Sequence, residues 1–205
     1  MRLRALLVVL AVAAAVQLAA CGGESGPATT TSSPTQATSG RTTPPTTTPQ
    51  SGGIDTMAGA STRPVHAPAS NRQTALLTDV RAARHEGFDR VVFAFRNVLP
   101  GYDVRYVSRP VHEDASGRTV PVAGGAVVRI RMEPALDADL SRAGAPRTYT
   151  GPLRFTPATP EVVELVRIGA FEGVLTWVAG VQDPVDFRVT TLTAPPRLIV
   201  DFRNH

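Results

Sequence analysis

The chain has 205 residues, a length typical of one folded domain with additional segments. Aromatic residues make up only 5% of it, and the 18 prolines and 17 glycines argue against a helical bundle. A single cysteine excludes a disulfide framework and a zinc site made of thiolates. All basic residues are arginine, and the net charge of +4 is too small to indicate a partner of nucleic acids.

Residues 1–20 have the three parts of a secretory signal peptide. Two arginines near the start precede an unbroken apolar run over 5–16, and small residues follow at 18–20. An apolar run of this length is shorter than the roughly 20 residues that a membrane-spanning helix needs. We therefore expect a cleaved leader.

The cysteine that follows the leader resembles a lipidation site. Leu18-Ala19-Ala20-Cys21-Gly22 is similar to the lipobox of bacterial lipoproteins, in which the thiol receives diacylglycerol with palmitate-type chains. Two or three acyl chains, each contributing about 0.8 kcal/mol per buried methylene, anchor a protein stably. We expect Cys21 to hold the mature chain at the extracytoplasmic face of the cell membrane.

A tether is predicted to follow over residues 21–70. The stretch from Gly22 to Gly53 contains no Val, Ile, Leu, Met or aromatic residue and is built mainly from Thr, Ser, Pro and Gly. Such a stretch buries too little apolar surface to offset the entropy of ordering, so disorder is expected. As a coil it would span about 35–40 Å on average.

The remaining residues, 71–205, are expected to form one all-β domain. Apolar and polar residues alternate along several short segments, which follow one another at a spacing of 8 to 15 residues with Gly or Pro between them. This spacing predicts an antiparallel β-sandwich or barrel. The expected strands cover 76–81, 91–96, 102–106, 128–132, 162–168, 173–181, 187–192 and 198–202.

One short helix is also predicted, over residues 134–143. Pro134 suits a first helical turn, Leu136 and Leu140 are four residues apart, and Gly144 suits the end of a helix.

The folded part resembles the AMIN-like domains of actinobacterial lipoproteins, relatives of the AMIN domain. The matching segments are 90–95, 100–104, 171–174, 187–192 and 195–202, the last of which reads Pro-Pro-Arg-Leu-Ile-Val-Asp-Phe. The resemblance implies a β-sandwich of two small sheets. It also implies binding to peptidoglycan without catalysis, although this chain has no amidase or secretin domain attached.

Arginines on outward strand positions are the first candidates for wall binding. Arg129 and Arg131 alternate with apolar residues on one expected strand, and Arg105 has the same arrangement on another. They could form a cationic stripe for anionic wall polymers, although a solvated sheet face has the same pattern.

Two further candidates have clear structural alternatives. Arg197 could bind the carboxylate of a peptide stem through its guanidinium, or it could pair with an acid of a neighbouring strand. Trp177 could stack on a sugar, but as the sole tryptophan it also suits a buried core.

No active site is predicted. Glu161 with Glu164, and Glu172 with Asp201, are the nearest candidates for a carboxylate pair, and the histidines lack ligand spacing, so neither a metal nor a cofactor is expected. The sequence thus indicates a lipid-anchored, non-enzymatic module that binds peptidoglycan or another wall polymer. An adaptor for envelope proteins and, less favoured, a carrier of small ligands stay open.

Overall fold

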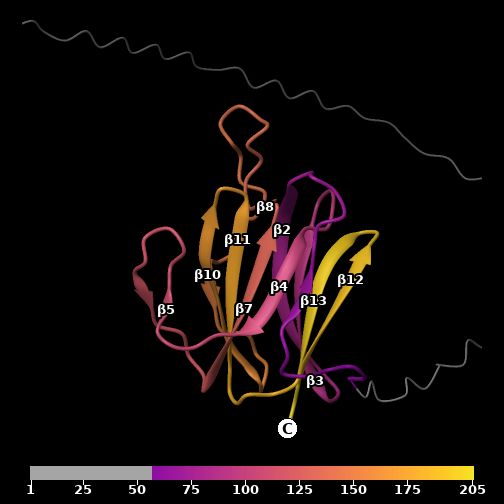
Figure 1. Cartoon of the computed structure of the whole chain (residues 1–205), viewed down its shortest axis with the longest axis vertical. Coiled ribbons are helices and arrows are strands. Elements are labelled where there is room, and N and C mark those ends of the chain that lie inside the picture. Colours follow the sequence, from indigo (N-terminus) through magenta and orange to yellow (C-terminus); the bar gives the residue numbers. More distant parts are fainter. Residues whose placement is uncertain (1–56) are drawn as a thin grey trace, which may run out of the picture. The chain divides into compact units, whose positions relative to one another are not determined.

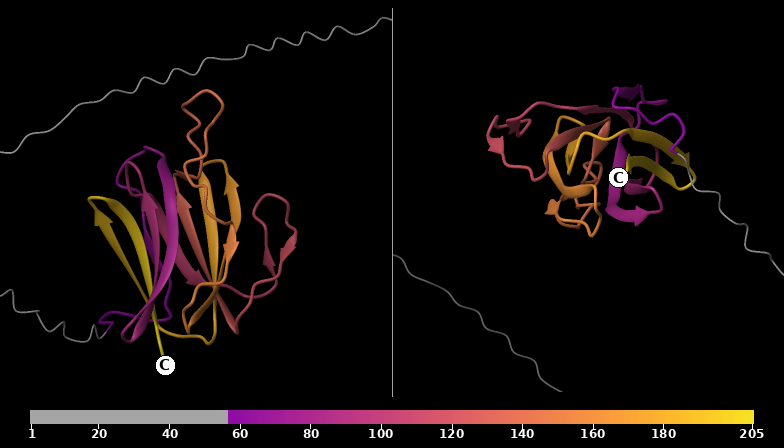
Figure 2. Two further views of the ribbon diagram at one scale, coloured as in Figure 1. Left: turned by 180° about the vertical axis from the view of Figure 1, so that it is seen from behind. Right: turned by 90° about the horizontal axis from the view of Figure 1, so that it is seen from below.

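In the computed structural model, residues 57–205 can be described; the expected signal peptide, Cys21 and most of the expected tether lie outside this range. The described chain folds into two layers of β-sheet (Figures 1 and 2). One sheet contains, in spatial order, β1 (Val65–Ala67), β4 (Gly101–Tyr106), β7 (Ala126–Glu133), β11 (Val174–Val181), β10 (Val162–Phe171) and β9 (Arg154–Phe155). The other contains β12 (Phe187–Thr193), β13 (Pro196–Arg203), β3 (Phe88–Phe95), β2 (Ala75–His85) and β8 (Ala135–Leu136). Neighbouring strands are antiparallel except for β2 and β8, so the predicted all-β sandwich is confirmed.

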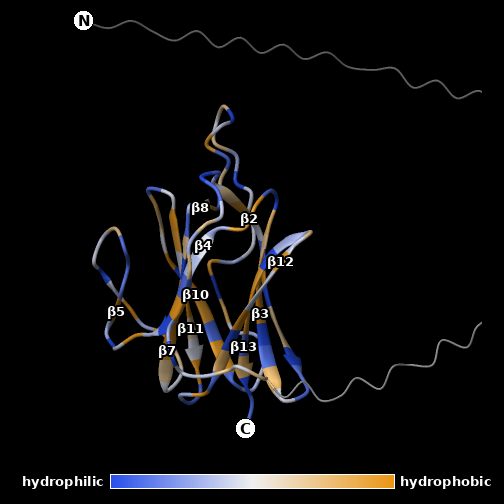
Figure 3. Cartoon of the chain, turned by 45° about the vertical axis from the view of Figure 1, so that its right-hand side comes forward, coloured by the Kyte–Doolittle hydropathy of each residue, from blue (hydrophilic) through white to orange (hydrophobic). Residues whose placement is uncertain are grey.

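Alternation along the strands separates the core from the outer faces. On β7, Val128, Ile130 and Met132 are fully buried, whereas Arg129 and Arg131 point to the other side of the sheet. The same alternation on β3 and β13 turns residues such as Phe93 and Leu198 inward. Figure 3 shows hydrophobic residues along the long strands and more hydrophilic residues in the loops.

The core between the sheets is densely filled with aromatic rings. Trp177 is fully buried and makes edge contacts with Phe93 and Tyr149, with ring centroids 6.1 and 5.8 Å apart. Such edge-to-face pairs stabilise a core beyond the contribution of buried area alone.

A long connection between β4 and β7 forms what we call the arm, residues 107–123. It contains the small hairpin of β5 (Val111–His112) and β6 (Thr119–Val120) and projects beside the six-stranded sheet (Figures 1 and 2). Val111 and Val122 of the arm form a second apolar cluster with residues on the outer face of that sheet, among them Val166 and Val178. The arm therefore covers part of a face that would otherwise meet solvent.

The predicted helix over 134–143 is wrong. Ala135 and Leu136 form β8, and the Ala135 N–H donates to the Gly173 carbonyl over 2.7 Å. The nearly buried Asp137 then binds the guanidinium groups of Arg147 and Arg167. The backbone and the carboxylate thus find partners in distant segments, which outweighs the weak helical spacing of two leucines.

The folded part also begins before residue 71, the position at which the sequence predicted the start of the domain. β1 pairs with β4, and Ser61 exchanges two backbone hydrogen bonds of 3.1 Å with Phe187. The side chain of Met57 is almost fully buried. Residues 57–70 therefore belong to the sandwich, because their backbone pairs with strands at the edges of both sheets. The segment has no apolar periodicity from which this pairing could be predicted.

Candidate functional site

The outer face of the six-stranded sheet gathers three of the candidate arginines. Arg105 on β4 lies directly opposite Arg129 on β7, and Arg131 follows two residues later on the same face. Their side chains are between about a third and a half exposed, at 43%, 36% and 40%.

Carboxylates on the same face balance these arginines. Asp103, only 12% exposed, accepts hydrogen bonds from the guanidinium of Arg105, one of them 2.6 Å long. These bonds are the main reason why the pKa of Asp103 lies below its usual value, with the nearby charge of Arg129 adding to the effect. Arg131 pairs with Glu133 over 2.7 Å. The expected cationic stripe is therefore a surface of mixed charge.

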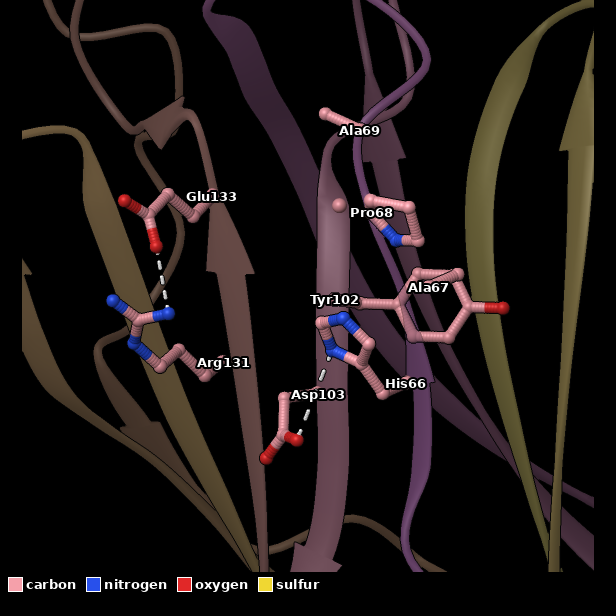
Figure 4. A pocket seen from close by; sticks show the side chains of 9 residues that line it. His66, Ala67, Pro68, Ala69, Tyr102, Asp103, Arg131 and Glu133 are labelled. Carbon is pink, nitrogen blue, oxygen red and sulfur yellow. Dashed lines mark ion pairs between the residues drawn. The ribbon is translucent and has the colours of Figure 1, made fainter.

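Three cavities line this face, and the central one shares residues with each of the other two. The edge cavity, about 210 Å³, lies beside β1 and is lined by His66, Asp103, Arg131 and Glu133 among others (Figure 4). The central cavity, about 240 Å³, also uses Arg131. The arm cavity, about 440 Å³, lies between the arm and the sheet and shares Asp114 and Arg129 with the central one. Shared walls make the three cavities neighbours on one surface.

The central cavity combines charges of both signs. Its lining consists of Asp114, Arg129, Arg131, Phe171, Glu172, Val174 and Thr176. Thr176 is 1% exposed, and its hydroxyl has no hydrogen-bond partner within residues 57–205. The Nε of Arg129 is likewise buried and without a partner in the described part of the chain. Since buried polar groups normally have partners, these two atoms suit a site that receives a polar ligand.

A tight turn places Phe171 and Glu172 at this cavity. Phe171 pairs with Val174 across the hairpin of β10 and β11, so that Glu172 and Gly173 form a two-residue loop. Both residues have positive φ, +49° and +78°, as a type I′ turn requires. The turn leaves Phe171 57% exposed.

The arm places Asp114 at the same cavity. The Asp114 N–H donates to the Ile168 carbonyl over 3.1 Å, and the Arg109 guanidinium donates to the carbonyls of Val122 and Gly124 over 2.6 and 2.8 Å. A Cβ at Gly169 would overlap the Asp114 carboxylate. The position of the Asp114 carboxylate thus depends on the missing side chain at position 169.

The other candidates do not join this site. Arg197 is half-buried on the outer face of the five-stranded sheet and has no ion pair with any described residue. Trp177 is fully enclosed between the sheets, so the sugar-stacking role considered for it is wrong. Cys21 lies outside the described residues.

Of the carboxylates considered for catalysis, Glu161, Glu164 and Asp201 have structural partners, and Glu172 has no ion pair with a described residue. Glu161 is almost buried, which raises its pKa, and it accepts a hydrogen bond from the Asp183 N–H over 3.1 Å. Glu164 binds Arg154 over 2.6 Å, and Asp201 binds two arginines. In the range 57–205, no group of three His, Cys, Asp or Glu residues could hold a metal ion. Nor does that range contain a helix long and apolar enough to cross a membrane.

Sequence reasoning did not connect the arginines with Asp114, Phe171, Glu172 and Thr176. These residues come from the arm, a hairpin turn and a neighbouring strand, and only the tertiary fold brings them together. The sequence offered one signal, an aromatic residue, Phe171, directly before the expected Glu-Gly turn. A ring at such a turn is exposed, which is unusual for a large apolar side chain.

A family model for the AMIN-like domain matches residues 75–204, from β2 to the end of β13. The chain belongs to the AMIN-like domain family. This family is associated with peptidoglycan-related binding. No match was found among curated proteins or among solved structures. The matched range covers both sheets of the AMIN-like sandwich but leaves out β1, which forms one wall of the edge cavity.

Proposed function

We propose that this AMIN-like protein is a non-catalytic binding module that is lipid-anchored through Cys21 and attaches to peptidoglycan at the outer face of the six-stranded sheet. The observation that supports this site best is the central cavity, in which two arginines, two carboxylates and an unpartnered buried hydroxyl meet. Peptide stems and sugars present amines, carboxylates and hydroxyls, so a polar cavity of mixed charge matches them better than a uniformly cationic face.

Sedimentation with purified sacculi tests the wall-binding part. The full-length protein, extracted from membranes in mild detergent, is expected to pellet with sacculi, and Arg131→Gln is expected to reduce the pelleted fraction. Arg197→Gln is the matched control, because Arg197 lies on the opposite sheet and is also partly exposed. Equal loss in both variants would point to general charge attraction instead of the proposed site. Loss in Arg197→Gln alone would move the site to the five-stranded sheet.

Fractionation of cells tests the anchor. Wild-type protein is expected in the membrane fraction and to incorporate a labelled palmitate analogue, whereas Cys21→Ser is expected to lose the label and leave the membrane. A labelled Cys21→Ser variant would contradict lipidation at this position.

If the protein does not bind sacculi, the adaptor hypothesis is favoured. In that case crosslinking to envelope proteins is the next experiment. A carrier of small apolar ligands is less favoured, because buried side chains such as Trp177, Phe93 and Phe187 fill the space between the sheets.

A further inference from the structure

We infer that the central cavity recognises an amino-acid centre, that is, one carbon that carries both an ammonium and a carboxylate group. The inference rests on the proposed function and narrows it, because it selects the peptide stem over the glycan as the part of the wall that enters this cavity. It follows from three properties of the cavity: the unused binding capacity of its charges, the unpartnered atoms in its wall, and its size.

The cations of the cavity retain unused donors. The guanidinium of Arg129 lies 3.7 Å from Asp103, which is too long for a hydrogen bond, and its Nε has no partner in the described chain. Arg131 makes one ion pair, with Glu133, although a guanidinium carries five N–H donors. A ligand carboxylate can therefore bind both arginines without breaking the pairs that exist.

The anions of the cavity are available as well. Asp114 and Glu172 are both exposed, and neither makes an ion pair with another residue of the range 57–205. They come from the arm and from the hairpin turn, while the arginines come from β7. A ligand ammonium beside its own carboxylate would meet these two anions, and charge-assisted hydrogen bonds of this kind are stronger than neutral ones.

The buried hydroxyl of Thr176 strengthens the case for a polar ligand. Thr176 lies opposite Arg131 in the strand register, on the same face, and lines the cavity from β11. A hydroxyl both donates and accepts, so it can serve either charged group of the ligand. Leaving it unpartnered costs free energy, which a bound polar group would recover.

The size of the cavity fits one residue at the end of a stem. Its volume of about 240 Å³ is below the range of about 300 to 1,000 Å³ that is usual for larger ligands. Val174 and the exposed ring of Phe171 provide apolar surface for the methylenes of such a residue. The arm cavity next to it offers space for the rest of the stem.

Calorimetric titration with soluble muropeptides tests the inference. The probe is a muropeptide whose stem ends in a diamino acid with a free amine and a free carboxylate on one carbon. It is compared with the same compound after amidation of that carboxylate and after acetylation of that amine. We expect each modification to weaken binding to the full-length, detergent-solubilised protein by about ten- to a hundredfold, since a hydrogen bond to a charged group contributes on the order of 1.5 to 3 kcal/mol.

Two variants assign the two charges. Arg131→Gln is expected to reduce the preference for the free over the amidated muropeptide, because only Arg129 then remains to bind the carboxylate, while still distinguishing the acetylated one. Glu172→Gln is expected to show the reverse pattern. Arg197→Gln, on the other sheet, is expected to keep both preferences. Because the side chains of Arg131 and Glu172 are substantially exposed, both variants should fold, which a thermal unfolding scan verifies.

The outcomes separate this inference from the proposed function. If sacculi are bound but the three muropeptides bind equally, the amino-acid centre is wrong and peptidoglycan binding stands. If neither sacculi nor muropeptides bind, the proposed function is wrong. If sacculi do not bind but millimolar free alanine competes with the muropeptide, the amino-acid chemistry is supported. The natural ligand is then a dissolved amino acid instead of the wall.

Discussion

Asp201 on β13 lies directly opposite Arg90 on β3 and accepts two hydrogen bonds from its guanidinium, 2.7 and 2.9 Å long. A third bond of 2.8 Å comes from Arg188 on β12, and the Asp201 side chain is fully buried. One carboxylate thus joins three adjacent strands of the five-stranded sheet. The acid of the Pro-Pro-Arg-Leu-Ile-Val-Asp ending therefore has a structural role.

Removing this carboxylate should destabilise the sandwich strongly. We expect Asp201→Ala to lower the free energy of unfolding by about 3 to 5 kcal/mol, because it leaves partly buried guanidinium groups without their acid. Denaturant unfolding followed by circular dichroism measures the loss. Asp79→Ala is the matched control, since Asp79 pairs with Arg81 where both side chains are about half exposed, and should cost less than about 1 kcal/mol. Similar losses in the two variants would refute a special role for Asp201.

Trp177 offers a second prediction, which separates the core from the binding face. Trp177→Phe should lower the free energy of unfolding by about 1 to 3 kcal/mol through the smaller ring, yet leave sedimentation with sacculi unchanged. In the wild type, its emission should be that of a buried indole and should resist quenching by acrylamide. Loss of sacculus binding in a folded Trp177→Phe protein would show that the ring, or its support of β11, takes part in recognition.

The ion pair at Asp103 predicts a dependence of stability on pH. The pKa of Asp103 in the folded protein lies below the usual 3.8, so the unfolded chain binds its proton more readily. The stabilisation from this group is therefore complete above about pH 5 and is lost as the pH falls below 3.8 towards the folded pKa. Asp103→Asn should be less stable than the wild type at pH 7, and the difference should shrink as the pH falls below 3.8 towards the folded pKa. Thermal unfolding at several pH values gives both curves, and parallel curves would contradict the assignment.

Strands such as β7 could be predicted because their own residues show a two-residue alternation, whereas β11 is apolar and buried along almost its whole length and shows none. Val128, Ile130 and Met132 on β7 need no knowledge of their neighbours to be placed inward. β1, β5, β6, β8 and β9 have two or three residues each, too few to show any period. β1 and β8 exist because distant segments pair with them, whereas β5 and β6 pair with each other in a local hairpin. The same long-range pairing replaced the expected helix by β8.

The candidate site divides in the same way. Arg105, Arg129 and Arg131 could be placed outward from their strand pattern, and the register indeed brings them side by side. The acids that balance them could not be foreseen. Asp114 reaches the face only because the arm folds back over Gly169. The charges that balance one another at a site come from different segments, which only the tertiary fold brings together. A sequence pattern describes one strand at a time and does not show which segments meet.

The position of the arm leads to a final prediction, at Gly180. A Cβ at this position on β11 would overlap the Ala123 carbonyl oxygen and would lie 3.0 Å from Val122 Cγ1. Both neighbours belong to the arm, and the carbonyl oxygen is backbone that cannot rotate away. Gly180→Ala should therefore push the end of the arm off the sheet, at a cost of about 1 to 3 kcal/mol in the free energy of unfolding.

This displacement should change binding as well as stability. The arm cavity and the central cavity share Asp114, so a displaced arm should weaken the affinity for the diamino-acid muropeptide. Ala115→Ser, an exposed change within the arm, is the control and should alter neither property. Hydrogen exchange of the arm amides, above all the Asp114 N–H that donates to Ile168, reports the movement directly. Unchanged exchange together with reduced stability would mean that β11 gives way instead of the arm.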